Sequence, residues 1–134
     1  MRVFALSLLL GLAAVVPVRD ASACKCVGRP FAEQLEGGEA VFAARLVAER
    51  HHGDDFEYTV EVDSVWRGTV KRTFVMHMGS NGGDCTMGQL EGKTWIFITD
   101  TQMHAHRCGG SREATPEVLA QVTKQLGAPR KPKS

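Results

Sequence analysis

The sequence predicts an all-β domain with flanking helices, folded as a small closed or partly open barrel and stapled by two disulfides. Polar and apolar residues alternate over residues 56–63, which is typical of a strand with one wet face. Residues 41–49 and 94–99 are mostly apolar, as in buried strands. Four cysteines, an even number, in a small chain with an export signal predict the disulfides. A small sandwich fits the same strand pattern and is the alternative architecture.

The first 23 residues have the features of a signal peptide. A nearly unbroken apolar run over residues 3–16 follows the single basic residue Arg2, and it is too short to cross a bilayer as a helix. The small residues at positions 21–23 suit a signal peptidase, so we expect cleavage directly before Cys24. No second long apolar stretch follows, and we expect a soluble protein that is secreted or periplasmic and has no transmembrane segment.

The mature chain is expected to form one domain over residues 24–128, followed by a disordered basic tail at residues 129–134. The signal peptide carries two basic residues and one acidic residue, and its removal leaves 14 of each. A chain without net positive charge has no general electrostatic attraction to nucleic acids or anionic membranes. We expect no nucleic-acid partner, and we expect a monomer.

A helix is expected near each end of this domain. The first covers residues 29–36, with Pro30 in its first turn, and it ends at the glycine pair 37–38. The second starts at Thr115 and ends before Gly127, and its apolar residues are spaced to lie on one face.

Strands are expected between the two helices. They cover residues 41–49, 56–63, 73–78 and 94–99. A turn at residues 51–55 separates the first two strands, and the second closes at Trp66-Arg67-Gly68. A glycine-rich loop at residues 79–84 leads from the third strand into Cys85.

All four cysteines, Cys24, Cys26, Cys85 and Cys108, remain after cleavage. A bridge between Cys24 and Cys26 would close a strained ring, because residues two apart on an extended chain lie at the wrong distance and angle. Each of them must therefore reach Cys85 or Cys108, and the residues alone leave both arrangements open. Bridges over such long loops contribute about 4 kcal/mol each in the chain-entropy treatment.

The sequence contains none of the common catalytic motifs, such as Gly-x-Ser-x-Gly or His-Glu-x-x-His. We therefore expect a protein that is not an enzyme and needs no cofactor. The unusual feature is the mature N-terminus, because the α-amino nitrogen and carbonyl oxygen of Cys24 can close a five-membered chelate ring on a metal ion. An α-amino group has a pKa of about 7.7 to 8.0 and loses its proton easily near neutral pH. A catalytic zinc ion keeps an open position that this terminus could fill, once two disulfides hold it still. The simpler interpretation is that Cys24 and Cys26 only staple the first strand.

Several segments of the mature chain carry a family resemblance, from Cys24 to about Cys108. They are Cys24-Lys25-Cys26-Val27, residues 39–45 (EAVFAAR), residues 58–62 (YTVEV), Val65-Trp66-Arg67-Gly68, and the later cysteines Cys85 and Cys108. They resemble the tissue inhibitor of metalloproteinases family and its netrin-like module. The most specific parts are the Cys-x-Cys terminus after the cleavage site and the segment that matches the family's Val-aromatic-basic-Gly.

This resemblance implies a five-stranded OB-fold-like β-barrel in which Cys24 pairs with Cys85 and Cys26 pairs with Cys108. It also implies inhibition of a zinc metalloprotease, in which the amino and carbonyl groups of Cys24 bind the catalytic zinc of the protease. The remaining protease contacts would come from Lys25, Cys26, Val27, Gly83 and Asp84.

The chain departs from the family's pattern at Lys25, whose side chain would enter the specificity pocket of the protease. Family members that inhibit animal proteases carry Thr or Ser at this position, and a lysine desolvated in an apolar pocket is costly without a partner. The second subdomain of the animal inhibitors and the third bridge of their first subdomain are missing. These departures put the identity of the target protease in doubt.

Two other functions fit parts of the sequence. A netrin-like module of the cell envelope could bind another protein without inhibiting a protease, because a fold does not settle function. A periplasmic copper-binding protein is suggested by Met76-His77-Met78 and by Met103, His104 and His106, since thioether and imidazole ligands suit copper. On a strand, however, the side chains of Met76 and Met78 face away from that of His77.

Lipidation of Cys24 would acylate its amino group and abolish chelation. A lipoprotein signal usually has Leu where Ala21 stands, and the charged residues Arg19 and Asp20 separate the apolar run from the cleavage site. We therefore expect a free amine at Cys24.

Overall fold

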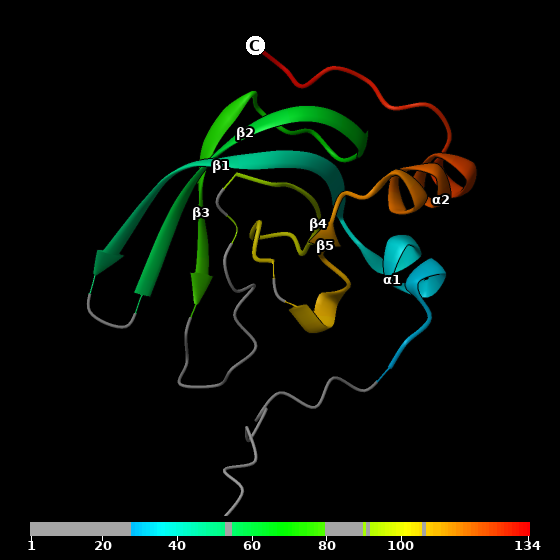
Figure 1. Ribbon diagram of the computed structural model, residues 1–134, viewed down its shortest axis with the longest axis horizontal. Helices are drawn as coiled ribbons and strands as arrows, with labels where there is room; N and C mark the ends of the chain where they lie inside the picture. Colours follow the sequence, from blue (N-terminus) through cyan, green and yellow to red (C-terminus); the bar gives the residue numbers. More distant parts are fainter. Residues whose placement is uncertain (1–27, 53–54, 80–89, 91, 106) are drawn as a thin grey trace, which may run out of the picture.

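The computed structural model describes residues 28–134, with gaps at residues 53–54, 80–89, 91 and 106. These residues form a five-stranded antiparallel sheet with two helices (Figure 1), which confirms the predicted mostly β domain with flanking helices. No helix in the described ranges is long and apolar enough to span a membrane. The predicted signal peptide and the cysteines Cys24, Cys26 and Cys85 lie outside the described residues, so the inferences drawn for them stay predictions.

The elements follow the predicted order, with two additions. They are α1 (Phe31–Gly37), β1 (Ala40–His52), β2 (Asp55–Arg67), β3 (Thr73–Gly79), β4 (Thr94–Thr99), the 3-10 turn η1 (Arg107–Gly109), β5 (Arg112–Glu113) and α2 (Pro116–Leu126). The additions, η1 and β5, are too short to show a periodic pattern. Three residues of the turn predicted at residues 51–55 belong to strands, because β1 runs to His52 and β2 starts at Asp55, and residues 53–54 between them lie outside the described part.

The sheet has the strand order β3-β2-β1-β4-β5. Three consecutive strands pair as neighbours, and β4 returns to pair with the free side of β1, which is a Greek-key arrangement. The register between β1 and β2 shifts at three places, and such irregularities bend a strand and increase its twist. In the described part of the chain no pairing joins β3 to β5, so closure of the sheet into a barrel stays a prediction.

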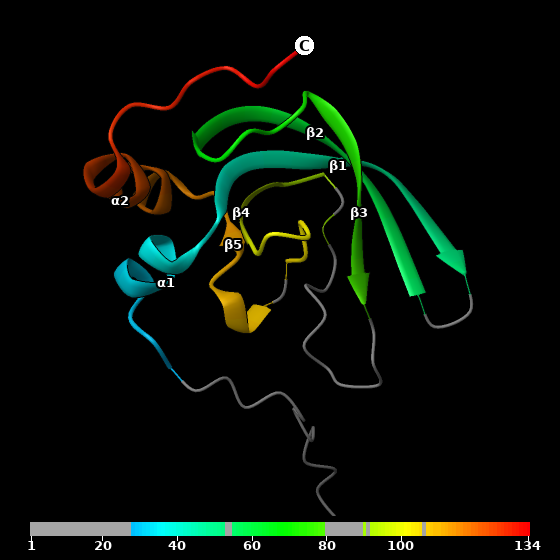
Figure 2. The ribbon, with the colours of Figure 1, turned by 180° about the vertical axis from the view of Figure 1, so that it is seen from behind.

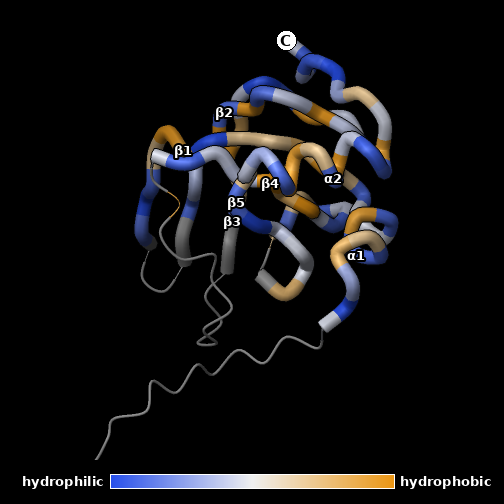
Figure 3. Tube along the Cα trace, turned by 45° about the vertical axis from the view of Figure 1, so that its right-hand side comes forward, coloured by the Kyte–Doolittle hydropathy of each residue, from blue (hydrophilic) through white to orange (hydrophobic). Residues whose placement is uncertain are grey.

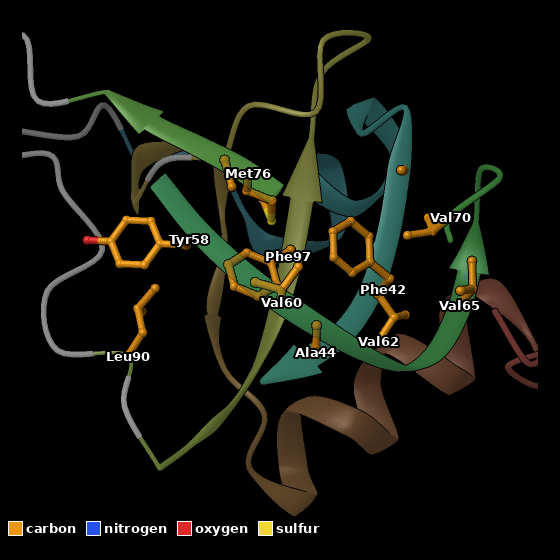
Figure 4. Packing of buried hydrophobic residues seen from close by; sticks show 12 residues of the cluster. Phe42, Ala44, Tyr58, Val60, Val62, Val65, Val70, Met76, Leu90 and Phe97 are labelled. Atoms are coloured by element: carbon orange, nitrogen blue, oxygen red, sulfur yellow. The ribbon is translucent and has the colours of Figure 1, made fainter. Parts of the chain in front are cut away.

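One hydrophobic cluster fills the concave side of this curved sheet (Figure 4). Phe42 of β1 is stacked on Phe97 of β4, with ring centroids 5.5 Å apart, and both rings are buried. In β2 the buried side chains Tyr58, Val60 and Val62 alternate with more exposed polar ones, so the predicted alternation is confirmed.

A second cluster lies between the other side of the sheet and the helices, which lie next to each other beside β1 and β4 (Figure 2). Its members are Phe31, Leu35, Val41, Ala43, Trp66, Ile96, Ile98 and Val122. Residues 40–44 of β1 and residues 96–99 of β4 are therefore buried, with side chains on both faces of the sheet, which explains why these segments are apolar runs rather than alternating patterns. The strand predicted as buried over residues 41–49 is buried only as far as Ala44, since Arg45 and residues 47–49 are exposed.

The ends of α2 follow the predicted signals. The hydroxyl of Thr115 accepts a hydrogen bond from the backbone N–H of Val118 at 3.3 Å, and Pro116 occupies the first turn of α2. Gly127 ends α2 with a positive φ of 86°. α1 begins at Phe31, two residues later than predicted, so Pro30 lies at the N-cap and not in the first turn, and the helix includes Gly37 and ends before Gly38.

The segment after α2 was expected to be disordered, but in the structure it is bonded to the sheet. Val65 of β2 and Arg130 exchange two backbone hydrogen bonds, of 2.9 and 2.8 Å, and Lys133 is bonded to Val70 and Arg72 at 2.9 Å each. β3 pairs with β2 only as far as Glu61, so the rest of the β2 edge is open to another segment. The basic, proline-containing composition of residues 129–134 suggested disorder. It could not show that β2 has an open edge to which this segment binds.

Candidate functional site

Most of the predicted protease-contact residues lie outside the described part of the structure. This applies to Cys24, Lys25, Cys26, Val27, Gly83 and Asp84, as well as to Cys85. Cys108, in η1, is described, and it is disulfide-bonded. Its partner lies outside the described residues, so the pairing of Cys26 with Cys108 stays a prediction.

Helix α1 is fastened to the segment that contains Cys108. The side-chain amide of Gln34 donates a hydrogen bond to the backbone carbonyl of Cys108 at 3.2 Å. The oxygen of the same amide accepts a hydrogen bond from the guanidinium of Arg112, also at 3.2 Å. We call the side chains of Gln34 and Arg112, together with the carbonyl of Cys108, the α1 clamp.

Arg112 is the central residue of the α1 clamp. Its guanidinium carbon lies 3.7 Å from the ring centroid of Phe31, and its Nε donates to the carbonyl of Gly110 at 2.9 Å. Burial lowers the pKa of Arg112, because desolvation penalises the charged form. The ring face and the two hydrogen bonds compensate part of that penalty.

Gly110 allows Gln34 to approach this segment closely. It has a positive φ of 95°, and a Cβ at this position would lie 2.6 Å from the side-chain oxygen of Gln34. Any other residue would displace the side chain of Gln34 from its hydrogen bonds or move α1, so the glycine favours the α1 clamp.

A pocket of about 200 Å³ lies where the chain enters α1. Arg29 and Gly109 both line it, so the residue five positions after Cys24 lies close to the neighbour of Cys108. Asp100 and His104 line another part of the same pocket. The segment just before α1 and the segment that contains Cys108 therefore border the same pocket.

The turn beside this pocket is held by the carboxylate of Asp100. Its Oδ1 accepts hydrogen bonds from the backbone N–H groups of Gln102 and His104, at 2.8 and 2.9 Å. These bonds, led by the one from His104, lower the pKa of Asp100 below its usual value. The imidazole Nδ1 of His104 lies 3.5 Å from the other carboxylate oxygen.

The segment Val65-Trp66-Arg67-Gly68 joins both helices to the sheet. Nη1 of Arg67 donates to the last carbonyls of α1, at 2.9 Å to Glu36 and 2.9 Å to Gly38, and also to the carbonyl of Leu35. The indole N–H of Trp66 donates to the hydroxyl of Thr123 in α2 at 3.3 Å. No local pattern in the sequence indicates these roles, because the partners are about 30 and 57 residues away.

Gly68 packs its backbone against β1. Its φ is +80°, and a Cβ there would lie 2.7 Å from the Cβ of Ala40. The Val-aromatic-basic-Gly segment therefore has a structural role in this domain, with a glycine that both the turn and the close packing require.

The structure describes the side chains of four of the methionines and histidines considered as copper ligands, whereas those of Met78 and His106 lie outside the described part. Met76 is 1% exposed and belongs to the core, whereas His77 is exposed, with its Nδ1 4.0 Å from a carboxylate oxygen of Glu57. Met103 packs against the core, and His104 lies against Asp100. Within the described ranges, no three His, Cys, Asp or Glu side chains are grouped to hold a metal ion.

Comparisons with known proteins do not assign a family: no protein-family model matches the chain, and no curated protein matches it.

Proposed function

We propose that this chain is an exported netrin-like protein that inhibits a zinc metalloprotease through its mature N-terminus. The α-amino nitrogen and the carbonyl oxygen of Cys24 would bind the catalytic zinc of the protease and displace the water from its open position. The zinc belongs to the protease, and the inhibitor needs no metal of its own.

The observation that carries this proposal is the α1 clamp. A flexible terminus binds a metal weakly, because its conformational freedom is lost on binding. The residues after Cys24 lead directly into α1, and Gln34 fastens α1 to the carbonyl of Cys108. A disulfide between Cys26 and Cys108 would then hold the terminus against an already rigid support.

The strand order gives independent support. An OB fold is a five-stranded, partly open Greek-key barrel, and this sheet has a Greek key of four strands with β5 added beside β4. The disulfide at Cys108 is compatible with the pairing that the family resemblance implies.

The test compares three forms of the mature chain with both disulfides formed. One form starts at an unmodified Cys24, one has an additional alanine before Cys24, and one is acetylated at the α-amino group. We expect the first to inhibit at least one zinc metalloprotease of a broad panel, and the other two to bind at least about a hundredfold more weakly, which corresponds to about 2.8 kcal/mol. Equal inhibition by all three forms, or none by the first, would refute the proposal.

Lys25→Ala provides a second readout at the same site. A side chain that enters the specificity pocket decides which proteases are inhibited, so this variant should change the ranking of proteases within the panel. Lys93→Ala, at an exposed position where Lys93 pairs with Glu113 at 2.8 Å, is the matched control and should leave the ranking unchanged. The same change of ranking in both variants would contradict the role given to Lys25.

A further inference from the structure

Five exposed basic residues from two distant segments meet on one surface of the domain. They are Lys71, Arg72, Arg130, Lys131 and Lys133, and we call them the basic patch. Lys71 and Lys133 are direct partners in a β-bridge, and Arg72 and Lys131 line one shallow pocket. The last residues of the chain run past β2 (Figure 1), and they are strongly hydrophilic (Figure 3).

The backbone holds the basic patch in place. Arg130 and Lys133 each make two backbone hydrogen bonds to residues 65–72, and the guanidinium of Arg130 also donates to the carbonyl of Gly68. The lysine side chains of the patch are not needed for these contacts. A partner would therefore find the cations already gathered and would not have to order the tail.

The charges in the basic patch are incompletely balanced. Lys71 and Lys133 face each other across the bridge, and like charges in directly opposite positions destabilise a sheet. Two acidic residues line the pocket beside Arg72 and Lys131, but Glu61 already pairs with Arg45 at 3.1 Å. The other acidic residue, Asp63, offsets only part of the positive charge of the patch. A bound anion would reduce the repulsion among the remaining cations.

The shape of the surface suits an anionic group of limited size. A second pocket, of about 160 Å³, is lined by Arg130, Lys131 and Lys133, with Thr69 at its side. Cationic side chains are strong hydrogen-bond donors to phosphate oxygens. Among the Phe, Tyr and Trp side chains whose burial the structure describes, none is exposed, so these provide no platform on which the bases of single-stranded nucleic acids could stack.

We propose that the basic patch binds the phosphate groups of an anionic phospholipid membrane. Clusters of four to eight Lys and Arg residues are sufficient for such electrostatic binding. The balanced charge of the whole chain argues against a general attraction to membranes, but the attraction here is local, because the fold brings residues 71–72 next to residues 130–133. The basic patch shares no residue with the proposed zinc-binding terminus.

The test measures binding of the mature chain to sedimented vesicles. Vesicles of phosphatidylcholine with about a third of phosphatidylglycerol are compared with vesicles of phosphatidylcholine alone. The patch variant carries Lys71→Gln, Lys131→Gln and Lys133→Gln, and the control carries Arg50→Gln, Lys93→Gln and Lys124→Gln, at exposed positions elsewhere. Both variants lose three positive charges, so they differ only in where the charges are lost. Circular dichroism verifies that both are folded.

We expect the unmodified chain to bind the anionic vesicles in preference, and we expect that binding to weaken as salt is added. The patch variant should bind them at least about tenfold more weakly, and the control about as well as the unmodified chain. Asp63→Asn removes the acidic neighbour and should strengthen binding. Equal losses in the two triple variants, equal binding to both kinds of vesicle, or binding to a soluble sulfated polysaccharide but not to vesicles would each overturn the proposal.

Discussion

The side-chain amide of Gln34 in α1 donates a hydrogen bond of 3.2 Å to the backbone carbonyl of Cys108, which is 74 residues further along the chain. The same amide also accepts from Arg112, so one side chain joins three parts of the domain. This contact makes the position of α1 depend on the segment around the disulfide-bonded cysteine.

Replacing Gln34 with Ala should lower the free energy of unfolding by about 1–3 kcal/mol, because two part-buried hydrogen bonds are lost and Arg112 keeps an unpaired donor. Chemical denaturation of the oxidised protein measures this change. Gln125→Ala is the control, since Gln125 also donates to a carbonyl, that of Ala32, at 2.7 Å, but in a solvent-exposed hydrogen bond. If Gln125→Ala lowered the free energy of unfolding as much as Gln34→Ala, the α1 clamp would contribute no more to stability than an exposed hydrogen bond.

Gly68→Ala should destabilise the domain more than Gly92→Ala. Both glycines have a positive φ, +80° and +70°, and a side chain in this conformation costs about 1–2 kcal/mol. A Cβ at Gly68 would also lie 2.7 Å from the Cβ of Ala40, whereas at Gly92 nothing lies within 4 Å. The difference between the two variants in thermal or chemical unfolding isolates the steric part. Equal destabilisation by the two variants would mean that β1 moves at Ala40 and makes room for the added Cβ at no energetic cost.

Arg67→Lys should cost about 1–3 kcal/mol of stability although the charge is kept. Nη1 of Arg67 reaches the carbonyls at the end of α1, and a shorter point charge does not reproduce the directed donors of a guanidinium. Arg50→Lys, at an exposed position of β1, is the control and should change the stability by less than about 0.5 kcal/mol. An equally small effect at Arg67 would argue against this helix cap.

The parts of the fold that the sequence predicted are those with a local signal. Residues 94–99 were predicted with the correct bounds because both faces of β4 are buried and the apolar run ends where burial ends. The second helix was predicted from Thr115 and Gly127, which are its caps. The end of β2 was predicted at Trp66-Arg67-Gly68 and lies at Arg67. The polar–apolar alternation stops before this end, because the adjacent residues Val65 and Trp66 are both buried, in different clusters.

The parts that could not be predicted depend on contacts between distant segments. The docking of Arg130 and Lys133 depends on the β2 edge that β3 leaves open, and the capping of α1 by Arg67 depends on a contact across 29 to 32 residues. The basic patch could not be predicted for the same reason. The net charge of the whole chain does not show that residues 71–72 and 130–133 lie side by side in the fold. For the candidate site, the sequence pointed to Cys108 but not to Gln34 or Arg112, because neither belongs to a motif.

Tyr58 should ionise above the usual pKa of 10.0, because its burial disfavours the phenolate and the charge of Glu49 raises the pKa further. The chain has a single tyrosine, so an ultraviolet absorbance titration of the folded protein reports this residue alone. In the unfolded chain Tyr58 loses its proton first, so the folded state binds more protons above pH 10 and the stability falls as the pH rises beyond that value. Glu49→Gln should bring the midpoint back toward 10 without restoring it completely, because desolvation is the larger cause. A midpoint at or below 10 in the folded protein would contradict the burial of this phenol against the core.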